Sequence, residues 1–143
     1  MRILGLDLGS RTLGMAMSTS DEKMALSKET FRFNEDDYEA AILKVKEYID
    51  KYKIETIVLG LPKHMNGDEG IRAQISHDFK DELEARYNVK VELMDERLTT
   101  VVSLNSLKMM NSGAKKRKEM VDQFAAQTIL QDYLDRKNLN EEE

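Results

Sequence analysis

The sequence predicts an α/β domain with a mixed five-stranded sheet and helices on both of its faces. Two patterns lead to this prediction. Three short strand-like segments follow one another at the start of the chain, and strand-like segments then alternate with segments of helical spacing. The length of 143 residues fits a single domain with one hydrophobic core. We expect the domain to cover residues 1–137.

The first third of the chain predicts an antiparallel meander of three strands. An apolar run over residues 2–8 is the first strand, and residues 14–18 form the second after a tight turn through residues 10–12. The alternation of Phe31 and Phe33 with polar neighbours marks the end of a third strand that starts near Lys23. Consecutive short strands of this kind pair antiparallel with their neighbours.

The remainder of the chain predicts helices that alternate with parallel strands. Apolar residues at helical spacing indicate helices, with Asn34 and Asp37 resembling an N-terminal cap of the first. Strands are indicated by short β-branched or alternating runs, and right-handed crossovers make them parallel. In chain order we expect a helix over 38–52, a strand over 56–59, a helix over 71–83, a strand over 89–94, helices over 99–110 and 115–136, and a frayed polar tail over 138–143.

Composition narrows the classes of function. The chain has no cysteine, which excludes disulfides, thiolate zinc sites and cysteine nucleophiles. We expect a cytoplasmic protein without a membrane partner, since no apolar run approaches the length of a membrane helix. The net charge of −5 argues against a grip on nucleic acid by bulk electrostatics. That argument weakens where acidic residues hold divalent cations, which reverse the local field.

Acidic residues stand at the ends of two predicted strands. Asp7 lies near the end of the first strand, and Asp95 and Glu96 follow the strand over residues 89–94. Strand ends are where sheets with crossover helices bind ligands. A plainer interpretation remains open for each strand end. Asp7 could cap the turn that follows it. Asp95 and Glu96 could belong to a solvated loop that is held by an ion pair to Arg97.

A third acid, Asp122, lies in the last predicted helix. Ala126 and Ile129 follow it at four and seven residues, so Asp122 shares an apolar or small face. The alternative is an exposed acid near the start of the helix, where its charge favours the helix dipole. Together, the three acids could hold Mg²⁺ or Mn²⁺, and two such ions about 3.5–4 Å apart can activate a water against a phosphodiester.

These motifs resemble the YqgF/RuvX family of the RNase H-like superfamily. The matching segments are Asp7-Leu8-Gly9-Ser10-Arg11-Thr12-Leu13-Gly14, Gly60-Leu61-Pro62 leading to Gly67, Asp95-Glu96-Arg97-Leu98-Thr99-Thr100, and Asp122 followed by Ala125-Ala126 and Ile129-Leu130. The resemblance implies an RNase H-like fold and cleavage of phosphodiesters with Mg²⁺ or Mn²⁺, held by Asp7, Asp122 and either Asp95 or Glu96. We favour Glu96, because strand side chains alternate between faces and a straight strand would point Asp95 the same way as the apolar residues Val91 and Leu93.

Four basic residues are candidate contacts to the substrate. Arg11 and Arg97 can pair with phosphate oxygens through two parallel hydrogen bonds, although Arg97 could instead pair with its acidic neighbours. Lys63, beside His64, is a further candidate. Lys116 belongs to the basic run 115–118, which fits a nucleic-acid backbone and an ordinary solvated helix face about equally.

The resemblance implies a nuclease and leaves its substrate open. We expect maturation of the 5′ end of pre-16S rRNA, with structured RNA in a ribosomal particle as the partner. The alternative is resolution of four-way DNA junctions, which requires a symmetric dimer; the sequence leaves monomer and weak homodimer open. The opening hairpin also resembles that of actin-like and sugar-kinase ATPases, but those folds need two such domains. A non-catalytic, ribosome-associated RNA-binding module is the last alternative.

Overall fold

The computed structural model describes residues 2–61, 70–95 and 114–142, of which 95, 114–123 and 140–142 are described as backbone alone. The described chain contains five strands and three helices. In chain order they are β1 (Ile3–Leu8), β2 (Thr12–Ser18), β3 (Ala25–Arg32), α1 (Tyr38–Tyr52), β4 (Thr56–Leu61), α2 (Ile71–Arg86), β5 (Lys90–Asp95) and α4 (Ala114–Glu142).

The strands form one mixed sheet in the order β3-β2-β1-β4-β5, which confirms the predicted sheet. β2 pairs antiparallel with both β1 and β3, with a bulge against β3 between Met15 and Ala16. β4 pairs parallel with β1 and with β5. The carboxyl ends of β1, β4 and β5 therefore lie at the same edge of the sheet, and the β1–β2 turn also lies there.

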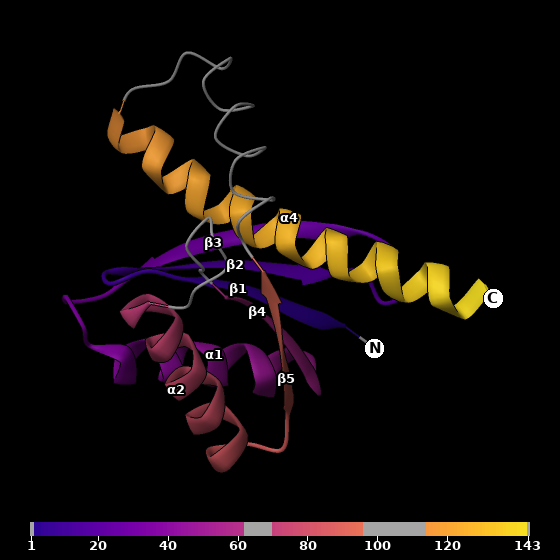
Figure 1. Ribbon diagram of the computed structural model, residues 1–143, viewed down its shortest axis with the longest axis horizontal. Helices are drawn as coiled ribbons and strands as arrows, with labels where there is room; N and C mark the ends of the chain where they lie inside the picture. The colour runs from indigo at the N-terminus through magenta and orange to yellow at the C-terminus, as the bar shows by residue number, and fades with distance from the viewer. Residues whose placement is uncertain (1, 62–69, 96–113, 143) are drawn as a thin grey trace.

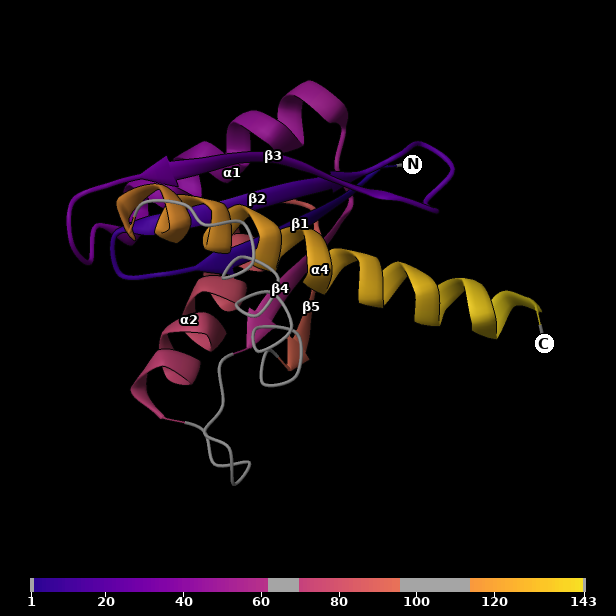
Figure 2. The ribbon, with the colours of Figure 1, turned by 90° about the horizontal axis from the view of Figure 1, so that it is seen from above.

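Helices cover both faces of this sheet, with α1 and α2 on one face and α4 on the other (Figures 1 and 2). The side chains of β1 alternate between the two layers. Leu4, Leu6 and Leu8 belong to the core beneath α1 and α2, whereas Ile3 packs with the apolar residues of α4. Because strand side chains alternate between faces, Gly5 and Asp7 share the α4 face with Ile3.

Small residues let α4 lie close to the centre of the sheet. A Cβ added to Gly5 would come within 2.8 Å of the Leu130 Cβ and 3.1 Å of the Ala126 carbonyl oxygen. Polar side chains also join the helix to the start of β3: the Gln131 amide accepts a hydrogen bond from the Ala25 N–H at 2.9 Å and donates to the Lys23 carbonyl at 3.0 Å. The position of α4 along the sheet is therefore closely specified.

α1 begins at Tyr38 as predicted, and of the two candidate cap residues it is Asp37 that caps the helix, with its side chain accepting from the Ala40 N–H at 3.4 Å. Details of the other two helices differ from the sequence-based predictions. Ile71, placed on the predicted apolar stripe of α2, is 78% exposed, since it is the first residue of the helix and lies beyond the core. α4 extends to Glu142, and Asn138, expected in a frayed tail, donates to the Glu22 carbonyl at 3.2 Å.

The helix predicted over 99–110 lies outside the described residues. None of the helices in the described ranges is both long and apolar enough to cross a membrane.

Candidate functional site

Asp7 lies at the carboxyl edge of the sheet, on the face that α4 covers. It is half-buried and is the second-last residue of β1. Gly14 of β2 lies directly opposite Asp7, and the pairing of Leu6 with Leu59 brings Gly60 of β4 beside it on the other side. Neither glycine has a side chain to project onto the α4 face. The two neighbouring strands therefore leave space around the Asp7 carboxylate.

The start of α4 passes over this end of β1. Figures 1 and 2 show that α4 runs in the direction opposite to β1, and Ala126 and Leu130 lie over Gly5. Moving from Gly5 to Asp7 advances about 6.6 Å along the strand. Moving one helical turn back from Ala126 to residue 122 covers about 6 Å. The helical turn that contains residue 122 therefore lies toward the end of β1 that contains Asp7, although the Asp122 side chain is not among the described atoms.

The described side chains of β5 alternate between the two faces of the sheet, as the sequence predicts. Val91 and Leu93 belong to the core under α1 and α2, whereas Met94 packs against the cluster under α4. The backbone of Asp95, paired with Leu61, is thus in the same alternation as Val91 and Leu93. Glu96 lies outside the described residues, as do Lys63 and Arg97, and Lys116 is described only as helical backbone.

The β1–β2 turn beside Asp7 is held by hydrogen bonds from the segment between β3 and α1. Within the turn, the Gly9 N–H donates to the Thr12 carbonyl at 2.7 Å. The Ser10 carbonyl accepts from the Asp36 N–H, and the Arg11 carbonyl from the Phe33 N–H, both at 2.9 Å. The turn is therefore a well-supported edge of the candidate site.

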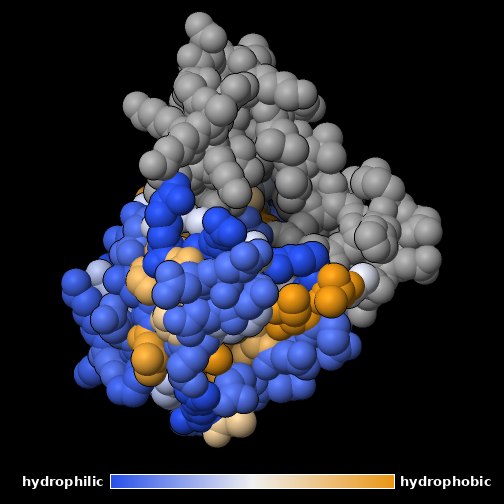
Figure 3. Space-filling view, turned by 90° about the vertical axis from the view of Figure 1, so that its left-hand side faces the viewer, coloured by the Kyte–Doolittle hydropathy of each residue, from blue (hydrophilic) through white to orange (hydrophobic). Residues whose placement is uncertain are grey.

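Arg11 projects from this turn toward solvent. Its guanidinium is 3.1 Å from the Glu35 carboxylate, and the two side chains are 65% and 59% exposed. Exposed ion pairs of this kind contribute little to stability, so a phosphate group can compete with Glu35 for the guanidinium. Seen from the end of the molecule where the β1–β2 turn lies, the described surface is mainly hydrophilic, with smaller hydrophobic patches (Figure 3).

Sequence reasoning missed Arg72, in the first turn of α2. Its Nη2 donates to the Leu8 carbonyl at 3.0 Å, and its Nη1 donates to the Tyr38 hydroxyl at 3.3 Å. Apolar spacing found the helix but not this polar contact. One signal was available: a basic residue in the first turn opposes the helix dipole, so another interaction must favour it there.

Carboxylate chemistry at this edge fits a hard divalent cation, because carboxylate oxygens are the ligands that Mg²⁺ and Mn²⁺ prefer. Among the side chains that the structure describes, no group of three or more acidic or histidine residues surrounds one point. Of the predicted metal ligands, Asp7 is the one whose side chain is described. A complete metal site would also need the carboxylates of Asp122 and Glu96.

A family model and two close relatives match nearly the whole chain. The model of the RuvX family, described as Holliday junction resolvase, matches residues 1–136. A protein of Bacillus subtilis (strain 168) is 46% identical over 138 residues, which are 96% of this chain and 100% of its own length. A protein of Geobacillus sp. (strain WCH70) is 44% identical over 137 residues, 96% of this chain and 99% of its own. Both relatives carry the name "Putative pre-16S rRNA nuclease".

Solved structures share the fold at low sequence identity. RuvC of T. thermophilus, determined in complex with a Holliday junction substrate, superposes with a TM-score of 0.61 at 13% identity and covers 96% of both chains. The Holliday junction resolvase of fowlpox virus has a TM-score of 0.56, again at 13% identity, over 96% of this chain and 99% of its own. The fold described above is therefore the RNase H-like fold.

Proposed function

Because this chain belongs to the RuvX family, we propose that it is a metal-dependent nuclease that matures the 5′ end of pre-16S rRNA. The family and the fold support a hydrolase that acts on nucleic acid. The names of the Bacillus and Geobacillus relatives favour the ribosomal RNA precursor as its substrate.

The observation that carries the proposal is the position of Asp7. This carboxylate is half-buried at the carboxyl edge of the sheet, and the glycines on both neighbouring strands place no side chain against it. Carboxylate oxygens suit a hard divalent cation, and strand ends at this edge are where sheets with crossover helices bind ligands, so we assign Asp7 as a metal ligand rather than as the cap of the turn.

We assign the metal to Asp7, Asp122 and Glu96. The turn of α4 over β1 supports Asp122, and the parity of Met94 supports Glu96 over Asp95. In this assignment Asp95 and Arg97 hold the loop after β5. Mg²⁺ or Mn²⁺, as two ions, would supply an activated water and stabilise the leaving oxygen. The protein's own contribution would be to hold the three carboxylates together at the sheet edge.

Basic residues around this edge are assigned to the phosphates of the substrate. Arg11 is exposed on the turn that follows Asp7, where a guanidinium can bind a phosphate through two parallel hydrogen bonds. Lys63, Arg97 and Lys116 are assigned the same role, since they belong to the segments that follow β4, follow β5 and begin α4. Local positive charge at these positions offsets the net charge of −5.

The test is cleavage of a labelled precursor RNA that contains the 5′ end of 16S rRNA, free and in an assembled ribosomal particle, in Mg²⁺ or Mn²⁺. Asp7→Asn keeps the size of the side chain but removes its charge, and we expect it to reduce kcat at least 100-fold. Asp50→Asn is the matched control, because Asp50 lies on α1 and pairs with Lys46 at the surface. Wild-type activity in Asp7→Asn, or no metal-dependent cleavage of either RNA substrate, would contradict the proposal.

A four-way DNA junction, run in parallel, tests the second function. The description of the family model favours this candidate. Paired nicks in the junction, without cleavage of RNA, would replace rRNA maturation by junction resolution. RNA binding without cleavage, unchanged in Asp7→Asn, would identify a binding module instead.

A further inference from the structure

The last carbonyl of β1 is held by a side chain from a different element. The parallel pairing of β1 with β4 extends to Leu6, so the Leu8 carbonyl lies beyond the paired part of the two strands. Arg72 donates to this carbonyl at 3.0 Å, across 64 residues of sequence. The same guanidinium reaches the Tyr38 hydroxyl with a second nitrogen. A guanidinium is suited to this role because its donors are fixed in one plane.

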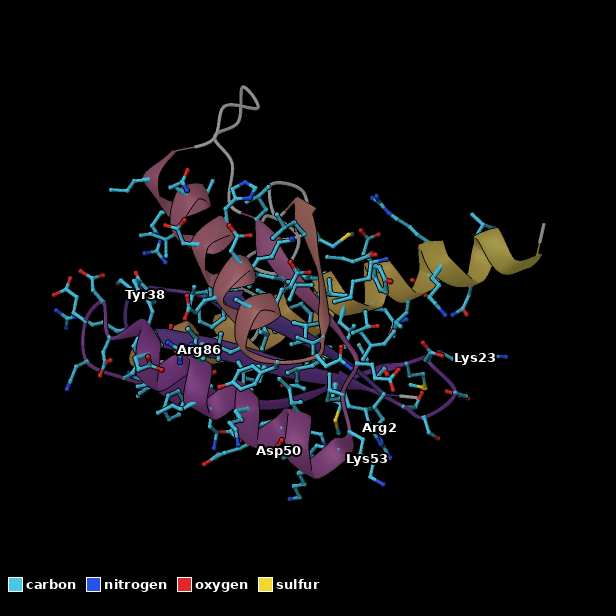
Figure 4. The ribbon with its side chains drawn as sticks, turned by 90° about the horizontal axis from the view of Figure 1, so that it is seen from below. Arg2, Lys23, Tyr38, Asp50, Lys53 and Arg86 are labelled. Atoms are coloured by element: carbon cyan, nitrogen blue, oxygen red, sulfur yellow. The ribbon has the colours of Figure 1, made fainter. Side chains whose placement is uncertain are left out.

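Tyr38 connects this contact to the β1–β2 turn. Its hydroxyl donates to the Asp36 carboxylate at 3.1 Å, and the Asp36 backbone N–H donates to the Ser10 carbonyl at 2.9 Å. Figure 4 shows Tyr38 at the opposite end of the molecule from Arg2 and Lys53, which lie near the amino end of β1. Arg72 and Tyr38 thus link the starts of α1 and α2 to the end of β1 and to the β1–β2 turn.

We propose that Arg72, supported by Tyr38, is a positioning residue that fixes the Asp7 carboxylate for the reaction. Asp7 precedes the clamped Leu8 directly, so displacement of the Leu8 carbonyl moves the backbone of Asp7. A displacement of about 1 Å at a reacting group can cost about 100-fold in rate. This inference rests on the proposed nuclease function, with Asp7 as a metal ligand.

The positioning role differs measurably from a direct contact to substrate. A positioning residue acts through the backbone, so its loss loosens the turn and lowers kcat while KM stays near the wild-type value. A residue that binds a phosphate of the substrate leaves the turn unchanged and raises KM when it is removed. Hydrogen exchange of the Gly9 N–H reports on the turn without any substrate or metal.

The experiment compares Arg72→Met, Arg72→Lys and Tyr38→Phe with the wild type. Each is measured by amide exchange of Gly9, by kcat and KM in Mn²⁺, and by thermal unfolding. In Arg72→Met we expect Gly9 exchange to rise about tenfold, as for loss of one ordinary hydrogen bond, and kcat to fall 10- to 100-fold. Arg72→Lys keeps the positive charge but lacks the planar set of guanidinium donors. We therefore expect its Gly9 exchange rate and its kcat to lie between those of Arg72→Met and the wild type. Tyr38→Phe should raise exchange by a smaller factor.

Arg86→Met is the matched control, because Arg86 ends the same helix and pairs with Glu39 and Glu82 at the surface. It should leave Gly9 exchange and kcat unchanged. Unaltered Gly9 exchange in Arg72→Met would overturn the proposal, as would faster exchange with an unchanged kcat. If the wild type cleaves no nucleic acid, the proposed function fails, and the exchange measurement still shows whether Arg72 holds the turn.

Discussion

Gly5 allows α4 to approach β1 as closely as it does. The Leu130 Cβ would lie 2.8 Å from a Cβ at this position, closer than two carbon atoms can pack without movement. The backbone of Gly5 has an ordinary strand conformation. Glycine is therefore required at this position because a side chain would collide with α4. The same approach sets how far the start of α4 lies from Asp7.

Gly5→Ala should therefore destabilise the protein. Overpacking of a well-packed core costs about 1–3 kcal/mol, more than the ~0.4–1 kcal/mol that a glycine-to-alanine change gains from the unfolded chain. We expect urea unfolding to show a net loss of about 1 kcal/mol or more in the free energy of unfolding. An unchanged midpoint would mean that α4 can shift outward at no cost.

At the scale of elements, α2 is tied to the edge strand β5 by one side chain. Glu84 accepts a hydrogen bond from Lys80 at 2.7 Å and another from the Val91 backbone N–H at 3.0 Å. The hydrogen bond from Lys80, followed by that from Val91, lowers the pKa of Glu84 below its usual value. A pKa lowered by folding stabilises the folded state above the unfolded pKa, and this contribution is lost as pH falls through the folded pKa.

Glu84→Gln should consequently reduce stability at pH 7 by about 1 kcal/mol. Its difference from the wild type should shrink as pH falls below the ordinary range of a glutamate. Denaturant unfolding between pH 7 and pH 3 measures both effects. Glu47→Gln removes an exposed carboxylate that pairs with Lys44, and it should change stability by less than about 0.5 kcal/mol at either pH. If Glu84→Gln were less stable than the wild type by the same amount at every pH in this range, the stabilisation would not come from the ionised Glu84 carboxylate.

At the scale of the whole molecule, an acidic protein is proposed to act on a polyanion. The net charge of −5 is unfavourable for such contact unless cations bind where the substrate does. A metal site at the edge of the sheet would also couple folding to metal binding, because the unfolded chain does not bring the three acids together.

Mn²⁺ should therefore raise the midpoint of thermal unfolding. One bound ion at a free concentration 100 times its Kd stabilises the folded state by about 2.7 kcal/mol. Asp7→Asn should lose most of this increase, whereas Asp50→Asn should keep it. An equal increase in Asp7→Asn would place the binding site elsewhere.

Local patterns in the sequence were sufficient to predict the strand order along the chain, the mixed sheet and the helices on both faces. Alternation and helical spacing arise from neighbouring residues, so they can be recognised without knowledge of the fold. The location of Asp7 at a strand end followed from the same reasoning. Element ends were predicted less well: the exposure of Ile71 depends on where the core stops.

Contacts between distant segments could not be predicted in this way. The approach of α4 to Gly5, the hydrogen bond from Arg72 to Leu8, and the continuation of α4 to Glu142 with Asn138 on Glu22 each join residues far apart in the chain. Periodicity in the sequence shows that a helix has an apolar face. The position at which that face packs on the sheet depends on the twist of the sheet and on the size of each facing side chain. For this reason the candidate residues could be named from the sequence, whereas the contacts that support the turn beside Asp7 became visible only in the folded chain.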